Sequence, residues 1–85
     1  MIDKNHVKGV VCDVNKHRAA AMTDDGYTIF DIEEGEVQIG DTVLGDLHAH
    51  GSREVFNVTR DHALFIYIEA KNITHESAQY LLYQA

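Results

Sequence analysis

Apolar and polar residues alternate along the first third of the chain, which predicts short β-strands separated by tight turns. Residues 6–14 (HVKGVVCDV) are rich in valine and alternate well enough for a first strand. Residues 18–23 (RAAAMT) have a helix-favouring composition, but six residues between two turn signals are too few for a stable helix, so we expect a second strand. Residues 24–26 (DDG) predict a hairpin turn, because the glycine can adopt a positive φ, and residues 27–32 then form a third strand.

Two more strands are expected from residues 42–47 and 53–59, on either side of a loop at residues 48–52. Gly40 and Asp41 form the turn that precedes them. Five strands joined by short turns, with no long helix among them, predict a small barrel that is closed or nearly closed.

The rest of the chain predicts a sixth strand and a terminal helix. In residues 64–70 (LFIYIEA), leucine and isoleucine alternate with Phe65 and Tyr67, so we expect both faces of this strand to be covered. Thr74 is a good N-cap for a helix over residues 75–84. The apolar face of this helix is expected to pack on the sixth strand or on a partner's. Its members are Ala78, Leu81, Leu82 and Ala85.

Composition and charge limit the classes of protein to which the chain can belong. With 85 residues, 45% of them apolar, it can build one small core, so we expect a single domain. A formal charge of −7 argues against a protein that grips nucleic acid through its phosphates, although single strands can also be bound by aromatic stacking. No stretch is long and apolar enough to span a membrane, the start lacks the apolar segment of a secretory signal, and a single cysteine cannot form an internal disulfide. We therefore expect a cytoplasmic protein.

Several short motifs of the chain recur in the order of one known family. They are Gly9-Val10-Val11, Asn15-Lys16, Asp24-Asp25-Gly26, Ile29-Phe30, Gly40-Asp41-Thr42-Val43 and Asn57-Val58-Thr59. In this order they resemble the cold-shock domain, a five-stranded OB-fold barrel. The chain is thus expected to be mainly β, with a five-stranded OB-fold-like barrel over residues 7–59. A sixth strand and a short C-terminal helix extend it over residues 60–85.

The resemblance implies a surface for single-stranded RNA or DNA, because outward aromatic residues on the family's second and third strands stack on bases. Lys16 matches the lysine of the second-strand motif, and Phe30 matches an aromatic position of the third. Arg18 and Ala20 stand where the family has phenylalanines, so both stacking rings of the second strand are replaced. The residues left to form a nucleic-acid surface are Lys8, Lys16, His17, Arg18 and Phe30.

Two orientations of the third strand are open at Phe30. If the strand follows the family, Phe30 and Ile32 point outward and Asp31 points inward as an unpaired carboxylate, which is costly. The reverse orientation buries Phe30 and Ile32 and exposes Asp31, and the inside preference of large apolar residues favours it. The position of Phe30 therefore decides whether the nucleic-acid surface keeps an aromatic ring.

A pair of histidines suggests a different kind of site. One residue separates His48 from His50, so in an extended segment both rings project from the same face, as metal ligation requires. Candidates for a third ligand are His17, His62, Asp46 and Glu54. An H-x-H sequence in a loop that ends in glycine is more often a solvated turn, so metal binding through His48 and His50 is the least favoured of the alternative functions, and we expect no cofactor.

Motifs for catalysis are missing from the sequence. It has no phosphate-binding glycine loop, no nucleophile with an oriented base, and no carboxylate pair at acid–base spacing. Cys12 lies among valines and is interpreted as a small core residue. We therefore expect a non-catalytic module that binds single-stranded nucleic acid weakly or through an atypical surface. The alternative is a module for protein interaction or self-association that uses the apolar residues 64–82.

Overall fold

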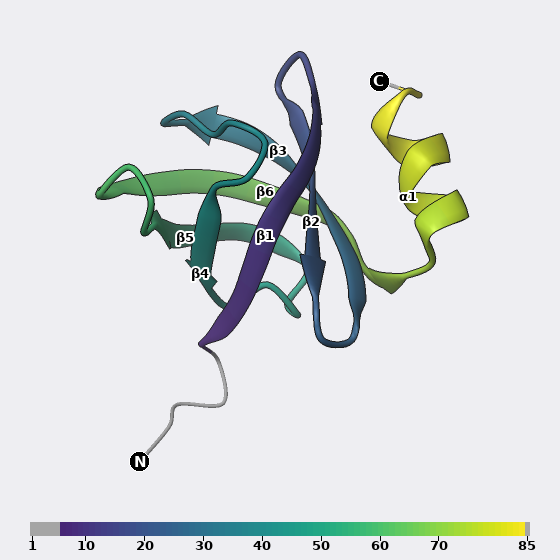
Figure 1. The fold of residues 1–85 in the computed structure, drawn as a ribbon, viewed down its shortest axis with the longest axis horizontal. Helices are drawn as coiled ribbons and strands as arrows, with labels where there is room; N and C mark the ends of the chain where they lie inside the picture. Colours follow the sequence, from purple (N-terminus) through teal and green to yellow (C-terminus); the bar gives the residue numbers. More distant parts are fainter. Residues whose placement is uncertain (1–5, 85) are drawn as a thin grey trace.

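The computed structural model describes residues 6–84 as a six-stranded antiparallel barrel with one helix on its outside (Figure 1). The strands are β1 (Val7–Asn15), β2 (Arg18–Thr23), β3 (Gly26–Glu34), β4 (Thr42–Gly45), β5 (Gly51–Asn57) and β6 (His62–Ile73), and the helix is α1 (His75–Leu82). The barrel closes in the order β1-β2-β3-β6-β5-β4. The mainly β class, the small barrel, the sixth strand and the terminal helix are therefore confirmed.

Strand β6 is part of the barrel wall. We expected it to extend a five-stranded barrel over residues 7–59, but β6 pairs with β3 on one side and with β5 on the other. Its 12 residues are enough for both pairings. Residues 62–68 pair with β5, and residues 65–73 pair with β3. The barrel is therefore completed only by the residues that follow position 59.

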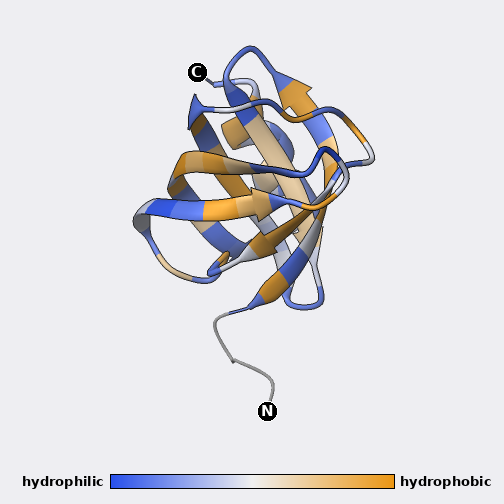
Figure 2. Cartoon of the chain, turned by 90° about the vertical axis from the view of Figure 1, so that its left-hand side faces the viewer, coloured by the Kyte–Doolittle hydropathy of each residue, from blue (hydrophilic) through white to orange (hydrophobic). Residues whose placement is uncertain are grey.

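Aliphatic side chains and one aromatic ring fill the interior of the barrel. Residues on each strand point alternately inward and outward, and Figure 2 shows hydrophobic and hydrophilic residues alternating along the strands. Phe30 is fully buried in this core, so the orientation that buries Phe30 and exposes Asp31 is the correct one. The other buried members of the core are Val11, Ala19, Ala21, Val37, Val43, Leu47, Val55, Leu64, Ile66 and Ile68.

At the start of β1, Val11 and not Cys12 faces the core. Val11 is buried, whereas Val10 and Cys12 are exposed, so the interpretation of Cys12 as a core residue was wrong. A bulge between Val11 and Asp13 shifts the register against β2. This shift returns Val14 to the core side, where it packs against the buried residues.

Helix α1 begins where the sequence predicted it. The hydroxyl of Thr74 accepts a hydrogen bond from the backbone N–H of Ser77, which caps the first turn. The helix ends at Leu82, before the expected end at residue 84, and Ala85 lies outside the described residues. Within residues 6–84, no helix is both long enough and apolar enough to cross a bilayer.

The apolar face of α1 packs mainly on the outer face of β2 and β3, whereas we expected it to pack on the sixth strand or on a partner's (Figure 1). Ala78 and Leu82 of the helix are buried against Ala20 of β2 and Ile29 of β3. The end of β6 reaches the margin of this second apolar cluster. As a result, α1 covers one outer face of the barrel and leaves the outer face of β5 and β6 to solvent.

Candidate functional site

The structure brings three of the five residues predicted to bind nucleic acid together, since Lys16, His17 and Arg18 line one pocket, but Lys8 and Phe30 lie elsewhere. Phe30 lies inside the barrel and cannot stack on a base, so its place on that surface was wrong. The side chain of Arg18 is only 15% exposed. Lys8, Lys16 and His17 are exposed, but Lys8 lies on β1 whereas Lys16 and His17 lie in the turn between β1 and β2.

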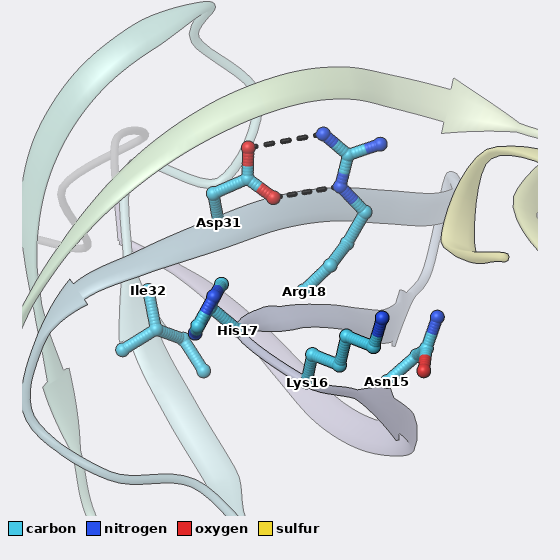
Figure 3. A pocket seen from close by; sticks show the side chains of 6 residues that line it. All are labelled: Asn15, Lys16, His17, Arg18, Asp31 and Ile32. Carbon is cyan, nitrogen blue, oxygen red and sulfur yellow. Dashed lines mark hydrogen bonds and ion pairs between the residues drawn. The ribbon is translucent and has the colours of Figure 1, made fainter. Parts of the chain in front are cut away.

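Arg18 holds two strands and the helix together. Its Nε donates to Oδ1 of Asp31 at 2.6 Å and its Nη2 donates to Oδ2 at 3.0 Å, so the ion pair is bidentate (Figure 3). Its Nη1 donates to the carbonyl oxygen of Leu81 at 3.0 Å. The hydrogen bonds from Arg18 hold the pKa of Asp31 below its usual range. The guanidinium is therefore engaged within the chain and is not free to bind phosphate.

Two further hydrogen bonds fix the end of α1 to the barrel. Nδ2 of Asn15 donates to the carbonyl oxygen of Leu82 at 3.0 Å, and the hydroxyl of Tyr83 donates to the carboxylate of Asp13 at 2.9 Å. The last carbonyl groups of a helix lack partners within it, so Arg18 and Asn15 cap its C-terminus with side chains. We call the contacts of Asn15, Arg18 and Tyr83 with their partners the helix latch. The helix latch holds α1 over the β2 and β3 face that the cold-shock resemblance assigns to nucleic acid.

Replacing Arg18 with methionine is expected to lower the free energy of unfolding by about 1–3 kcal/mol, because Asp31 and the last turn of α1 lose their donor. Amide hydrogen exchange should show a larger loss of protection in α1 than in β5. Arg53→Met is the matched control, because the side chain of Arg53 is 40% exposed and its ion pair with Asp46 is long, with 3.8 Å between Nε and Oδ2. An equal loss of protection throughout the chain would contradict the role of the helix latch.

A pocket of about 440 Å³ lies beside the ion pair of Arg18 and Asp31. Its lining residues are Asn15, Lys16, His17, Arg18, Asp31 and Ile32, and Figure 3 shows the guanidinium turned toward the carboxylate. The charges of Arg18 and Asp31 neutralise each other, and Asn15 is engaged in the helix latch. Three of its polar side chains, those of Arg18, Asp31 and Asn15, are thus engaged within the chain, and we assign this pocket no ligand.

The two histidines of the H-x-H sequence have different partners. Nε2 of His50 lies 2.8 Å from the carbonyl oxygen of Glu69, and its ring packs edge-on against Tyr67 with 6.4 Å between the ring centroids. Nε2 of His48 lies 3.6 Å from the carboxylate of Asp25. Among residues 6–84, no group of three or more His, Cys, Asp or Glu side chains could hold a metal ion. The metal hypothesis therefore has no third ligand in the described part of the chain.

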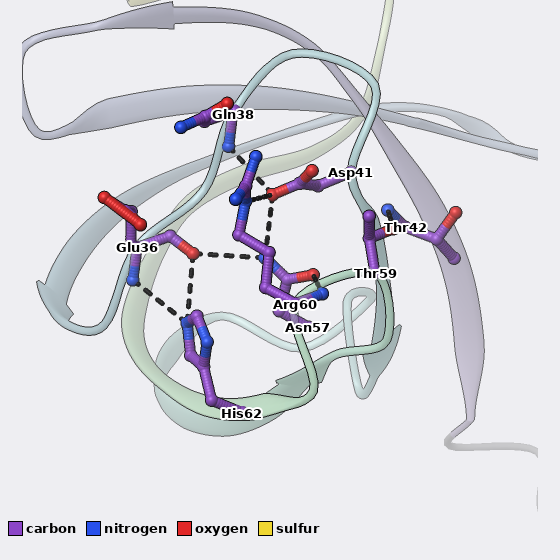
Figure 4. A network of polar contacts seen from close by, with 8 residues as sticks. All are labelled: Glu36, Gln38, Asp41, Thr42, Asn57, Thr59, Arg60 and His62. Atoms are coloured by element: carbon purple, nitrogen blue, oxygen red, sulfur yellow. Dashed lines mark hydrogen bonds and ion pairs between the residues drawn. The ribbon is translucent and has the colours of Figure 1, made fainter.

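A buried carboxylate organises the loops at one end of the barrel (Figure 4). Asp41 is 3% exposed, and its Oδ2 accepts hydrogen bonds from Nδ2 of Asn57 at 2.9 Å, from the backbone N–H of Gln38 at 2.9 Å and from Nε of Arg60 at 2.7 Å. Burial alone raises the pKa of Asp41, but these three hydrogen bonds together hold it below its usual range. Because the carboxylate oxygen is saturated by groups of the same chain, we assign this network a structural role.

Three aromatic side chains are exposed on the outer face of β5 and β6. Phe56 and Phe65 each keep 40% of their surface exposed, and Tyr67 keeps 37%. We expected both faces of β6 to be covered, and for this outer face the expectation was wrong. The reason is that the helix latch holds α1 on β2 and β3, away from Phe65 and Tyr67.

The register of β5 and β6 places these rings in a diagonal row. Phe56 lies opposite Ala63, and Phe65 and Tyr67 follow Ala63 on the same face of β6 at a spacing of two residues. Diagonal neighbours on one face of a sheet are close enough for aromatic side chains to interact. We call Phe56, Phe65 and Tyr67 the aromatic row.

Carboxylates flank the aromatic row. Phe65 lies opposite Glu34 of β3 and opposite Glu54 of β5, and both glutamates are exposed. Neither glutamate forms an ion pair with another residue in the part of the chain that the structure describes. Tyr67 lies opposite Asp31, whose charge is neutralised by Arg18. The middle of the aromatic row therefore has two free negative charges at its sides.

The sequence did not predict that Phe56, Glu34 and Glu54 lie on one surface. For Phe56, the available signal was its alternation with Val55 and Asn57, which are both buried. For Glu34 no local signal exists, because its position beside β6 depends on how the barrel closes. Only the three-dimensional fold brings the three residues to the same face.

Comparisons with models of protein families, with curated proteins and with solved structures give no match to this chain. The resemblance to the cold-shock domain therefore stays a prediction. The kind of partner has to be inferred from the exposed surface itself.

Proposed function

We propose that this chain is a non-catalytic binding module that docks a segment of a partner protein on the aromatic row. The observation that carries the proposal is the exposure of three large aromatic side chains in one row on the outer face of β5 and β6. Aromatic residues are enriched at the centre of protein interfaces, where their rings bury a large area with little loss of side-chain entropy. Contiguous apolar patches on a protein surface often mark interaction sites.

The charge of this surface favours a protein over a nucleic acid as partner. The formal charge of the chain is −7, and Glu34 and Glu54 on either side of Phe65 repel phosphate groups. The face of β2 and β3 is covered by α1, so nucleic acid could reach it only after the helix moved. Binding to single-stranded nucleic acid is thus the alternative that the binding experiments have to exclude.

The closed barrel favours docking through side chains. At Phe65 and Tyr67, β6 is paired with β3 on one side and with β5 on the other, so a partner cannot add a strand beside these rings. The outward side chains of β5 and β6 therefore supply the contacts.

Peptide selection followed by mapping tests the proposal. A phage library of random short peptides is selected on the immobilised chain, and the selected peptides are titrated into isotope-labelled protein for NMR. We expect the amide shifts to concentrate in β5 and β6, and we expect Phe65→Ser to raise the Kd at least about tenfold, as at interface hot spots.

Tyr80→Ser is the matched control for this experiment. Tyr80 is an aromatic residue of α1 that is 67% exposed, so its replacement removes an exposed ring outside the aromatic row. We expect the Kd of this variant to equal that of the unmodified chain. Peptides that map to another face, or that bind Phe65→Ser without loss, would contradict the proposed function.

A further inference from the structure

We propose that the aromatic row recognises a basic segment, and that a lysine or arginine side chain of the partner lies on the ring of Phe65 between Glu34 and Glu54. This inference rests on the proposed function and specifies the chemistry of the partner. Three observations support it: the register of the strands, the free charge of the two carboxylates, and the charge of the whole chain.

The register places both carboxylates at the ring. Strand β6 runs between β3 and β5, and Phe65 has Glu34 as its partner on β3 and Glu54 as its partner on β5. On the β5 side the pairing is regular, and directly opposite residues there have Cβ atoms about 4.5–5.5 Å apart. On the β3 side an irregularity between Ile32 and Glu34 shifts the register, and Glu34 is the residue that lies opposite Phe65. All three side chains are exposed, so a group that approaches from solvent meets the ring and both carboxylates at once.

The two carboxylates are free to bind a cation. Within residues 6–84, neither Glu34 nor Glu54 has an ion-pair partner, whereas Arg18 neutralises Asp31 beside Tyr67. The face of an aromatic ring attracts a cation through its quadrupole, and carboxylates accept charge-assisted hydrogen bonds from ammonium and guanidinium groups. The aliphatic stem of a lysine or arginine also packs well on an apolar ring. The site therefore suits a long cationic side chain better than a neutral one.

Other occupants fit this surface less well. A second copy of the chain also has a charge of −7, and pairing two aromatic rows would bring the carboxylates of both copies together. A phosphate backbone is repelled by the same charges. A small divalent cation needs more oxygen ligands than two glutamates supply, and the described residues contain no such group. A basic polypeptide segment satisfies both the charge and the apolar character of the row.

The composition of the selected peptides and their binding to charge variants test this inference. We expect lysine and arginine to be enriched over their frequency in the starting library. We also expect the double variant Glu34→Gln, Glu54→Gln to bind these peptides about tenfold more weakly, and the Kd of the unmodified chain to rise with added sodium chloride.

The matched control is the double variant Asp24→Asn, Glu76→Gln. It removes the same amount of negative charge from the turn between β2 and β3 and from α1, away from the aromatic row. We expect its Kd to equal that of the unmodified chain. Equal weakening by the two double variants would overturn the local site in favour of a general effect of net charge.

The remaining outcomes distinguish a failure of this inference from a failure of the proposed function. Peptides that need Phe65 but lack basic residues, and that bind Glu34→Gln, Glu54→Gln unchanged, overturn this inference and leave the proposed function standing. Peptides that bind Phe65→Ser without loss overturn both. Oligothymidylate that shifts the amides of the aromatic row at low salt identifies nucleic acid as the occupant. Self-association in sedimentation velocity that Phe65→Ser abolishes identifies a second copy.

Discussion

Replacing Asp41 with alanine is expected to lower the free energy of unfolding by about 3–5 kcal/mol, because the substitution removes a buried acceptor that receives three hydrogen bonds at once. Asn57 is fully buried and would lose an acceptor, and Arg60 would lose the carboxylate that neutralises it. In a domain of this size, 1 kcal/mol corresponds to roughly 4–8 °C in Tm, so Tm should fall by more than about 12 °C. Thermal unfolding followed by circular dichroism measures this change.

Two variants give the controls for Asp41→Ala. Asp41→Asn keeps the shape and one acceptor oxygen, and we expect an intermediate loss of about 1–3 kcal/mol because an amide cannot neutralise Arg60. Asp46→Ala removes a half-exposed carboxylate with one 3.8 Å contact to Arg53, and we expect a loss of less than about 1 kcal/mol. Equal losses for Asp41→Ala and Asp46→Ala would contradict the role of the Asp41 network.

The pH profile of stability is a second measurement on the same carboxylate. Although burial raises the pKa of Asp41, the hydrogen bonds from Asn57, Gln38 and Arg60 hold it below the value of about 4 in the unfolded chain. The unfolded chain therefore takes up the proton first as the pH falls. The stability that Asp41 contributes is present above about pH 4 and is lost as the pH falls through the folded pKa. We expect urea unfolding of Asp41→Asn to depend less steeply on pH in acid, and an unchanged slope would contradict the shift.

Replacing Phe30 with alanine is the second change with a large expected effect. Phe30 is fully buried at the centre of the barrel, so the substitution should lower the free energy of unfolding by about 3–5 kcal/mol through lost burial and the cavity that remains. Phe30→Leu fills most of this space, and we expect a loss below about 1.5 kcal/mol. Urea unfolding of both variants checks these values, with the leucine variant available if the alanine variant does not fold.

Phe65→Ala is the matched control for Phe30→Ala, because it removes the same ring from the outer face. Phe65 is 40% exposed, and we expect its removal to change the free energy of unfolding by less than about 1 kcal/mol. We therefore expect Phe30→Ala to lower the free energy of unfolding strongly and Phe65→Ala to affect mainly the binding of a partner. Similar losses for both variants would contradict the assignment of faces.

The sequence predicted most strands because their patterns are local. The alternation of Leu64, Ile66 and Ile68 predicted that these residues share one face of β6, and all three are fully buried. Thr74 identified the start of α1, because an N-cap acts on the first turn of its own helix. Signals of this kind depend on neighbouring residues and are visible without the fold.

Features that depend on distant contacts could not be predicted in this way. The exposure of Cys12 and the return of Val14 to the core side depend on a bulge between Val11 and Asp13, and the position of this bulge is set by the pairing of β1 with β2. The position of α1 depends on Arg18 and Asn15, which lie more than sixty residues before the carbonyl groups that they cap. For the same reason, the exposure of Phe65 became visible only when the structure showed where the helix packs.

The most direct test of the account is the amide chemical-shift map of the chain with a selected peptide. If the outer face of β5 and β6 is the docking surface, the shifts will centre on Phe56, Phe65 and Tyr67. They will be lost in Phe65→Ser and retained in Tyr80→Ser. Shifts that centre on α1 or on β1 and β2, or that persist in Phe65→Ser, would contradict it.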